Sequence, residues 1–268
     1  MHGEQKMTEE IAGGSGGEKG AVASISKAIA ILRLLGSANA PLTMTEIARG
    51  THLTPSSCHD LVSTLVSIGL VQASSLGKSY ELGARTVKLA KRALHPSDKF
   101  HEVQHSMNLI SDKYDINLTI YQPFGSQSYL STIVSEGSAP IRIRLSPGQE
   151  HKLFQGAAGR MFAAYSTLDA AEFTAQLDRI GVSGDKAVAA FRQLVADDKA
   201  RGWTEDHGVT QRGVAAIGVP ILTGDARLLG VIELVMFQRQ YEHAPIAAIV
   251  RDATHLAQEV AGALGRTA

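Results

Sequence analysis

The sequence predicts an α+β protein with an N-terminal winged helix-turn-helix domain, a linker helix, and a C-terminal domain in which helices cover an antiparallel sheet. Three observations lead to this prediction. Two short helical patterns joined by a tight turn lie between Leu42 and Gly69. Two alternating runs typical of a β-hairpin follow, between Leu70 and Leu82. Beyond Asn117, apolar strands occur among helical segments, as in an α+β domain with one covered sheet.

The length of 268 residues, with 44% apolar and 19% charged residues, allows about two globular domains. No apolar run is long enough to cross a bilayer, and the N-terminus lacks the basic-then-apolar pattern of a signal peptide. The single cysteine, Cys58, excludes an internal disulfide and agrees with a reducing compartment. We therefore expect a cytoplasmic protein with no membrane partner.

The charge is unevenly distributed, although the formal net charge of the chain is zero. From Gly20 to His95 there are eight basic and three acidic residues, which gives this segment a net charge of +5 and leaves −5 for the remainder. Such an asymmetry is typical of a nucleic-acid-binding module joined to a neutral or acidic domain. A solvated basic helix explains part of it.

The first 20 residues contain GGSGG and few large apolar groups, so we expect residues 1–20 to form a flexible tail. The winged helix-turn-helix domain then spans residues 21–83. Its first helix is capped by Ser24 or Ser26 and ends at Gly36. The apolar face of this helix consists of Ile25, Ala28, Ile29, Ile31, Leu32, Leu34 and Leu35.

The helix-turn-helix comprises a helix from Met44 to Gly50, a turn from Thr51 to Leu53, and a second helix from Thr54 to Gly69 with a proline in its first turn. Thr43 or Thr45 caps the first helix. The second helix buries Leu61, Val62, Leu65, Val66 and Ile68, and it exposes Ser56, Ser57, His59, Asp60 and Ser63. Short polar side chains suit a helix that lies in the major groove of DNA, and an ordinary capped helical hairpin is the alternative.

The hairpin after this helix forms the wing, with Lys78 at its tip, where a phosphate or the minor groove of DNA is within reach. A basic helix from Arg85 to Leu94 follows and serves as the linker, residues 84–95. It presents both cationic and apolar groups, and we expect it to take part in homodimerisation together with the winged helix. The apolar residues available for packing are Val87, Leu89, Ala90 and Leu94.

The C-terminal domain, residues 96–268, begins with a helix from Phe100 to Tyr114. The expected strands are Asn117–Pro123, Gln127–Ser135, Pro140–Leu145, Val214–Leu222 and Leu228–Phe237. The expected helices are a long one that starts near Phe154, Leu168–Ile180, Lys186–Arg201 and Pro245–Leu264.

One motif in this domain is typical of enzymes. The segment from His101 to His105 matches H-E-x-x-H, in which two histidines bind zinc and Glu102 acts as a general base. No third ligand follows at a suitable spacing, and both histidines lie beside the apolar stripe on a solvated face. A metal-dependent hydrolase is therefore the alternative function, and we assign neither a catalytic nor a metal site.

Two other segments contain residues typical of functional sites. Cys58 and His59 are adjacent in a helix and point about 100° apart, so they cannot act as nucleophile and base, and Cys58 is expected to be a small half-buried side chain. In Gly156-Ala157-Ala158-Gly159-Arg160, small residues at a helix start leave N–H groups that favour an anion. Close packing of the helix on the sheet explains the same residues.

Five segments together resemble the IclR family of bacterial transcription regulators: ISKAIAILRLL, MTEIARGTHLTPSSCHDLVSTLVSIGLV, YELGARTVKLA, GQEHKLFQGAAGRMFAAY and RGWTEDHGVTQRGVAAIGVPI. The resemblance extends from about Ser24 to the C-terminus. It implies a winged helix that binds operator DNA as a homodimer or tetramer, and a GAF-like C-terminal domain that binds a small effector. It implies no catalysis and no cofactor.

We expect DNA contacts from Thr45, Ser56, Ser57, His59, Asp60 and Lys78. Where the family usually has a lysine near the start of the recognition helix and an arginine midway, this chain has Pro55 and Asp60. The loss of positive charge should weaken non-specific affinity for DNA. Asp60 would instead accept a hydrogen bond from a cytosine amino group or pair with a neighbouring arginine.

The resemblance places the effector pocket at Ile143, His151, Ala157, Ala158, Asp206, Ala216, Glu233 and Val235. Apolar walls predict a small, partly apolar effector such as an aromatic or short-chain acid or a derivative. The helix-start N–H groups would receive a carboxylate or other acceptor, while Asp206 and Glu233 would receive a donor. A carboxylate in an apolar pocket needs a partner, and pairing of Glu233 with Arg142, Arg144 or Arg160 is the structural alternative.

Overall fold

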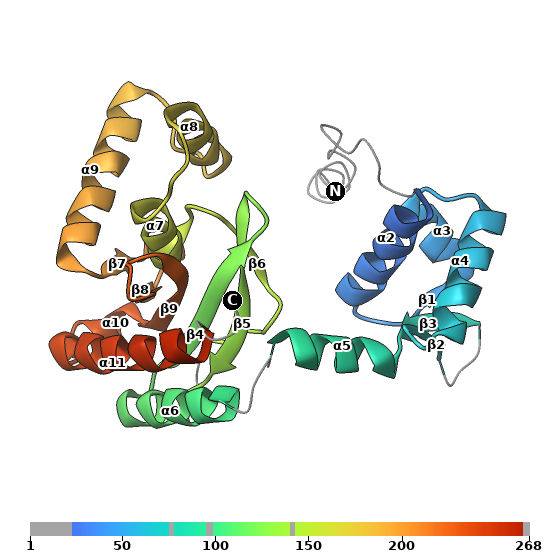
Figure 1. Ribbon diagram of the computed structural model, residues 1–268, viewed down its shortest axis with the longest axis horizontal. Coiled ribbons are helices and arrows are strands. Elements are labelled where there is room, and N and C mark those ends of the chain that lie inside the picture. The colour runs from blue at the N-terminus through green and yellow to red at the C-terminus, as the bar shows by residue number, and fades with distance from the viewer. Residues whose placement is uncertain (1–22, 75–77, 95–98, 140–142, 265–268) are drawn as a thin grey trace. The chain divides into compact units, whose positions relative to one another are not determined.

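The computed structural model describes residues 23–74, 78–94, 99–139 and 143–264. The chain divides after Ala93 into two compact units, each with its own hydrophobic core (Figure 1). We call them the N-terminal and the C-terminal unit. The expected flexible tail, residues 1–20, lies outside the described residues. Among the described helices, none has the length and apolar character needed to span a membrane.

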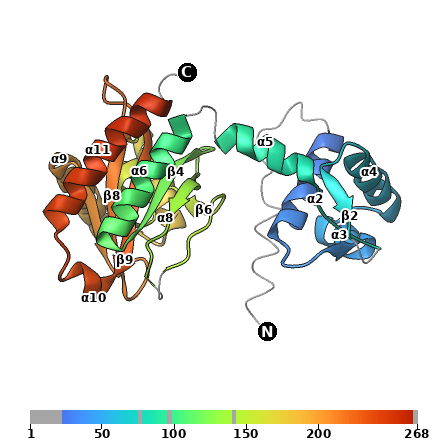
Figure 2. The same ribbon diagram turned by 90° about the horizontal axis from the view of Figure 1, so that it is seen from below.

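The described part of the N-terminal unit contains three helices and a small antiparallel sheet, which form the predicted winged helix-turn-helix, and most of the linker helix (Figure 2). The sheet has the strand order β1-β3-β2, and its first strand, two residues long, was not predicted. The bounds are α2 Ala23–Ser37, β1 Leu42–Thr43, α3 Met44–Thr51, α4 Pro55–Ser67, β2 Val71–Ala73, β3 Ser79–Leu82, and then the linker helix α5 Ala84–Leu94.

Local side chains define both helices of the helix-turn-helix. The Thr43 side chain accepts a hydrogen bond from the Glu46 N–H, and Glu46 accepts one from the Thr43 N–H, which makes a capping box at the start of α3. His52 ends α3 in a left-handed conformation, with φ of 54°. Thr54 caps α4, whose first residue is Pro55, because a proline at this position loses no intrahelical hydrogen bond.

The core of the N-terminal unit takes a narrow stripe from each helix. Ile31 and Ile47 are fully buried, and so is Cys58, which was expected to be half-buried. Burial raises the pKa of the Cys58 thiol, so the group stays protonated and unreactive. The prediction that Val66 and Ile68 are buried is wrong, since they are 37% and 42% exposed.

The first helix also differs from its prediction. Ser24 and Ser26 lie inside α2 and do not cap it, because the helix already includes Ala23. Ile25 and Ile29 are exposed. A helix in a small unit contacts its neighbours along one side only, so an apolar pattern wider than this contact leaves residues in solvent.

The C-terminal unit is built on a six-stranded antiparallel sheet with the order β6-β5-β4-β9-β8-β7. Helices α6 and α11 pack on one face, and α7, with α8 and α9 behind it, covers the other (Figures 1 and 2). The strands are β4 Asn117–Phe124, β5 Ser128–Ser135, β6 Glu150–Lys152, β7 Thr204–His207, β8 Val214–Leu222 and β9 Leu228–Phe237. The helices are α6 Lys99–Tyr114, α7 Gly156–Ala164, α8 Ala170–Arg179, α9 Asp185–Arg201, α10 Gln238–Tyr241 and α11 Ile246–Leu264.

The edges of this sheet depart from the sequence prediction. Of the expected strand Pro140–Leu145, residues 143–145 are not in a strand, and the others lie outside the described residues. The edge strands are instead β6 and β7, which were missed because both are short and rich in charged or polar residues. The expected long helix near Phe154 begins at Gly156 and has nine residues.

The register of the central strands sorts the side chains onto two faces. Ile120 pairs with Ile232, and both are buried in the core under α6 and α11. Thr119 pairs with Glu233, one position along in each strand, so these two side chains share the opposite face, which α7 covers. We call this the α7-facing side of the sheet.

Candidate nucleic-acid interface and candidate ligand site

The exposed face of α4 carries most of the residues expected to touch DNA. Ser56, His59 and Asp60 are exposed, while Ser57 is partly buried. The Thr54 hydroxyl, which caps α4, donates to the Ser57 Oγ at 3.0 Å, so Ser57 is held in one orientation by the cap. Serine hydroxyls and an imidazole on one helix face can read base edges or contact phosphates.

The remaining residues of this interface lie at its edges. Thr45 is exposed in the first turn of α3, and Lys78 is exposed beside β3 with a positive φ of 72°. The ion pair of Asp60 is with His59, at 3.7 Å between Nδ1 and Oδ1, and the two side chains are 82% and 67% exposed. Among the described residues, the expected pairing of Asp60 with an arginine is therefore replaced by a weak contact with its neighbour.

Most of the residues expected to bind the effector lie on the α7-facing side of the sheet. Asp206 pairs with Ala216, and Ala216 with Val235, so the three occupy one row across β7, β8 and β9. Glu233 lies in the next row, and α7 brings Ala157 and Ala158 over it. The register places these residues on one surface although they come from four elements.

Glu233 is held against the start of α7. Its Oε1 accepts a hydrogen bond of 2.9 Å from the Ala158 N–H. Burial raises the pKa of Glu233 to about 7; the Ala158 N–H opposes this shift, and the nearby Asp206 carboxylate adds to it. The helix-start N–H that was expected to receive a ligand carboxylate is thus already bonded to the protein's own carboxylate.

The alternative in which Arg160 pairs with Glu233 is wrong. Arg160 Nε donates to Asp198 at 2.7 Å, and its Nη2 donates to the backbone carbonyl of Glu205. Arg142 lies outside the described residues. Within the described part of the chain, no cationic side chain forms an ion pair or hydrogen bond with Glu233.

Aromatic rings form a wall on the same side of the sheet. The Tyr129 ring is stacked on His151 at 5.2 Å and on Phe162 at 5.0 Å between centroids, and Tyr121 meets Tyr129 edge-on at 5.0 Å. Burial lowers the pKa of His151, so its imidazole is neutral near pH 7. The buried His151 Nε2 and the hydroxyl of Thr119 make no hydrogen bond with the described residues.

Two of the expected residues have other roles in this structure. Asp206 is 4% exposed and accepts a 2.8 Å hydrogen bond from the Val209 N–H and further ones from Thr210, so it holds the loop after β7. Ile143 lies apart from Glu233: its carbonyl accepts from the Asn117 amide, and it lines a cavity of about 150 Å³ that Val235 also borders.

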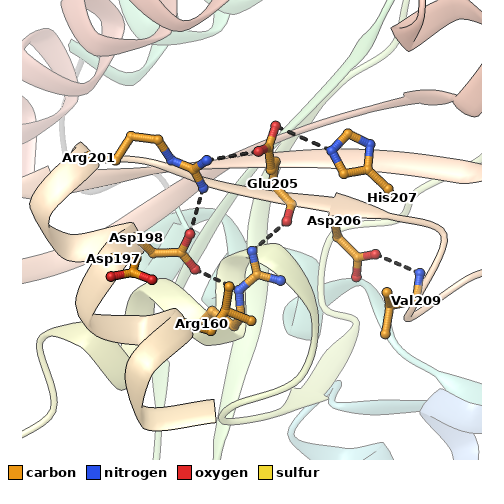
Figure 3. A pocket seen from close by; sticks show the side chains of 9 residues that line it. Arg160, Asp197, Asp198, Arg201, Glu205, Asp206, His207 and Val209 are labelled. Carbon is orange, nitrogen blue, oxygen red and sulfur yellow. Dashed lines mark hydrogen bonds and ion pairs between the residues drawn. The ribbon is translucent and has the colours of Figure 1, made fainter. Parts of the chain in front are cut away.

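A larger cavity of about 460 Å³ lies beside β7, between α7 and α9 (Figure 3). Among the lining residues, Asp198 accepts hydrogen bonds from Arg160 at 2.7 Å and from Arg201 at 2.6 Å, and Arg201 also pairs with Glu205 at 2.8 Å. We call these four residues the edge ion-pair cluster. The sequence analysis missed it because its members come from α7, α9 and β7, and no local spacing connects them. The cavity shares Asp206 with the expected effector residues and does not include Glu233.

The histidines of the H-E-x-x-H motif lie on α6. His101 and His105 are both exposed. The described residues contain no group of three or more histidine, cysteine, aspartate or glutamate side chains that could hold a metal ion.

Comparisons with known proteins agree with this architecture. Residues 24–75 match the IclR helix-turn-helix domain, and residues 92–261 match the C-terminal domain of bacterial IclR transcriptional regulators. The chain is 25% identical over 211 residues to the glycerol operon regulatory protein of Streptomyces griseus. The matched region covers 75% of this chain and 79% of that protein. It is 24% identical over 261 residues to the protein of the same name from Streptomyces coelicolor, with 90% and 97% covered.

Solved structures show the same fold. An IclR transcriptional regulator from Alicyclobacillus acidocaldarius has a TM-score of 0.76 and 19% identity, over 91% of this chain and 99% of that one. An IclR homologue from Microbacterium hydrocarbonoxydans, complexed with 4-hydroxybenzoate, has a TM-score of 0.74 and 17% identity, over 92% and 100%. The two matched domains account for most of the sequence, and this chain belongs to the IclR family of bacterial transcriptional regulators.

Proposed function

We propose that the N-terminal unit binds operator DNA and that a small, partly apolar molecule on the α7-facing side of the sheet changes operator affinity. The observation that carries the effector site is the polar group formed by Thr119, which is fully buried, and by His151 and Glu233, which are partly buried. These polar side chains lie among aromatic rings, and two of them have polar atoms without a protein partner. Buried polar groups are normally hydrogen-bonded, so such atoms point to a ligand.

The solved homologue with 4-hydroxybenzoate supports a ligand of this size in the same fold. Such a ligand shifts operator affinity only if it contacts the DNA-competent and incompetent arrangements differently. Glu233 is partly buried and Thr119 is fully buried in this structure, so a ligand that bonds to both must move α7 or the aromatic wall. A movement of this kind is what allows binding to be coupled to another part of the chain.

For DNA binding, we propose domain limits of 21–83 for the winged helix and 84–95 for the linker. Thr45, Ser56, Ser57, His59 and Asp60 contact bases or phosphates, and Lys78 contacts the backbone or the minor groove. The exposed α4 side chains and the exposed Lys78 beside the wing strand support this assignment. Phosphates attract Lys78 whatever the DNA sequence, and the polar α4 side chains suit base edges.

We also propose that the chain acts as a homodimer or tetramer. Val87 and Leu89 on α5 are 55% and 63% exposed. A second copy packed on this helix would bury them, and a two-fold dimer would read a pseudo-palindromic operator with half-sites about one helical turn, or a multiple, apart. Footprinting that shows a single unrepeated half-site contradicts this proposal.

The DNA-binding proposal is tested by retardation of genomic fragments and then of operator variants. Lys78→Ala should weaken binding to all sequences alike and flatten the salt dependence, because one phosphate contact is lost. Ser57→Ala should change the preference at one or two base pairs. Equal effects of both variants on every operator contradict the division of roles, and a full-length chain that retards no fragment at low salt contradicts DNA binding.

A further inference from the structure

We infer that Glu233 makes the effector site of this chain exclude carboxylates and select an aromatic or other partly apolar ligand with a neutral or cationic hydrogen-bond donor. The inference rests on the proposed effector site and goes beyond it by assigning the charge of the ligand. Its basis is the position of one carboxylate relative to α7, Asp206 and the aromatic wall.

Glu233 already occupies the start of α7, where a ligand carboxylate would bind. The N-terminus of a helix attracts anions because its first N–H groups have no partner in the helix and carry partial positive charge. In α7 the Ala158 N–H already donates to Glu233 Oε1 at 2.9 Å. The start of the helix is also close to the same oxygen, since a Cβ built on Gly156 would lie 4.0 Å from it. A carboxylate on a ligand would therefore have to displace Glu233 from this position.

The charges near the start of α7 are negative. Asp206 is close enough to raise the pKa of Glu233 by repulsion, so two carboxyl groups lie near the start of α7. Arg160, on the same helix, is committed to Asp198 and the Glu205 carbonyl. With no cationic partner of Glu233 among the described residues, an incoming anion meets like charge, whereas a donor meets acceptors.

Glu233 and Thr119 can still accept hydrogen bonds from a ligand. A carboxylate offers about four acceptor positions; the Ala158 N–H uses one, and the Tyr121 hydroxyl also hydrogen-bonds to Glu233, so about two remain for a ligand. The Thr119 hydroxyl, fully buried and paired in register with Glu233, makes no hydrogen bond with the described residues and can bond the same ligand group. Tyr121 and Tyr129 supply ring faces and edges for an apolar body or a cation.

Three matched probes test the inference: 4-hydroxybenzoate, 4-hydroxybenzamide and 4-hydroxybenzylamine, which share a ring and a hydroxyl and differ in charge. Calorimetric titration at pH 8 would use the full-length chain and Glu233→Gln, with Glu242→Gln as the control. Glu242 is exposed on the surface, and its change alters the net charge by the same amount.

The wild-type chain should bind the amide or the amine at least about tenfold more tightly than the benzoate. The amide and the amine can donate a hydrogen bond to the ionised Glu233, and the benzoate carboxylate cannot. Glu233→Gln should remove most of this preference, and Glu242→Gln should keep it. If Glu233→Gln fails to fold by circular dichroism, Glu233→Ser takes its place.

The inference is overturned if the wild-type chain prefers the benzoate, or if the order of the probes is the same after Glu233 is replaced. Binding of none of the probes to any of the proteins is a different result, because it removes the proposed effector site and the inference with it. A preference that shifts in Glu242→Gln as much as in Glu233→Gln would show an effect of net charge, and it also counts against the inference.

Discussion

Two carboxylates of the C-terminal unit differ in the charge of their hydrogen-bond partners. Asp198, 1% exposed, lies between the guanidinium groups of Arg160 and Arg201 at 2.7 and 2.6 Å. Glu233 has only neutral donors, the Ala158 N–H and the Tyr121 hydroxyl, and a second carboxylate lies close by; burial raises its pKa to about 7. Two guanidinium groups on Asp198 hold α7, α9 and β7 together, whereas Glu233, without a cation, favours its neutral form or a ligand with a donor.

The largest expected effect comes from breaking the paired site. Asp198→Asn removes the negative charge and leaves the Arg160 side chain, 11% exposed, with the Glu205 carbonyl but without its charged partner. We expect a loss of about 3 to 5 kcal/mol in the free energy of unfolding, measured by urea denaturation. Asp197→Asn is the matched control, because Asp197 is the exposed neighbour on the same helix and should change stability by about 0.5 kcal/mol or less. Similar losses in both variants would show that the edge ion-pair cluster is not the source.

Replacing Glu233, which has no cationic partner, should raise the free energy of unfolding, whereas replacing Asp198 should lower it. The pKa of Glu233 is about 7 in the folded chain, against an ordinary value of 4.5. Above pH 7 Glu233 is ionised in both the folded and the unfolded chain, and the pKa difference destabilises the folded chain by about 3 kcal/mol. Glu233→Gln keeps an acceptor for the Ala158 N–H and should therefore raise the free energy of unfolding by up to about 3 kcal/mol at pH 8. The gain should shrink towards pH 5, where the wild-type carboxyl is protonated in the folded state.

The neighbours of Glu233 determine how this pH dependence is measured. Tyr121 and Tyr129 face it with raised pKa values and stay protonated between pH 5 and 8. Asp206 also faces it, and the lowered pKa of His151 gives an opposite trend, with stability rising as pH increases towards the ordinary value for histidine. The wild type and Glu233→Gln both contain these groups, so the difference between their free energies of unfolding reports on Glu233. A difference that does not vary from pH 5 to pH 8 contradicts the raised pKa.

The smallest effect is expected at the exposed side of the edge ion-pair cluster. Arg201 is 35% exposed, and its replacement leaves Asp198 bonded to Arg160. Arg201→Ala should cost about 1 kcal/mol, because solvent screens a partly exposed pair and one partner of Asp198 remains. The loss should decrease in high salt. A cost as large as that of Asp198→Asn would mean that Arg201, and not Arg160, neutralises the buried carboxylate.

The local signals in the sequence predicted the helix-turn-helix well. Thr43, Thr54 and the proline after it act within one or two turns of chain, so the starts of α3 and α4 follow from neighbouring residues. Long apolar strands such as β8 and β9 were also predicted at their observed bounds. The short polar edge strands β6 and β7 were not, because their only requirement is a neighbouring strand that offers hydrogen bonds.

The sequence by itself determined which residues can carry a charge, cap a helix or fill a core, and the family resemblance placed Glu233 in a pocket. Tertiary structure alone decided the partners of these charges. Glu233 and Ala158 are 75 positions apart, and Arg160 and Asp198 are 38 apart. Their contacts depend on strand register and on how α7 packs on the sheet, and both are set by the whole core. Local spacing therefore could not show that Arg160 neutralises Asp198 and leaves Glu233 without a cation.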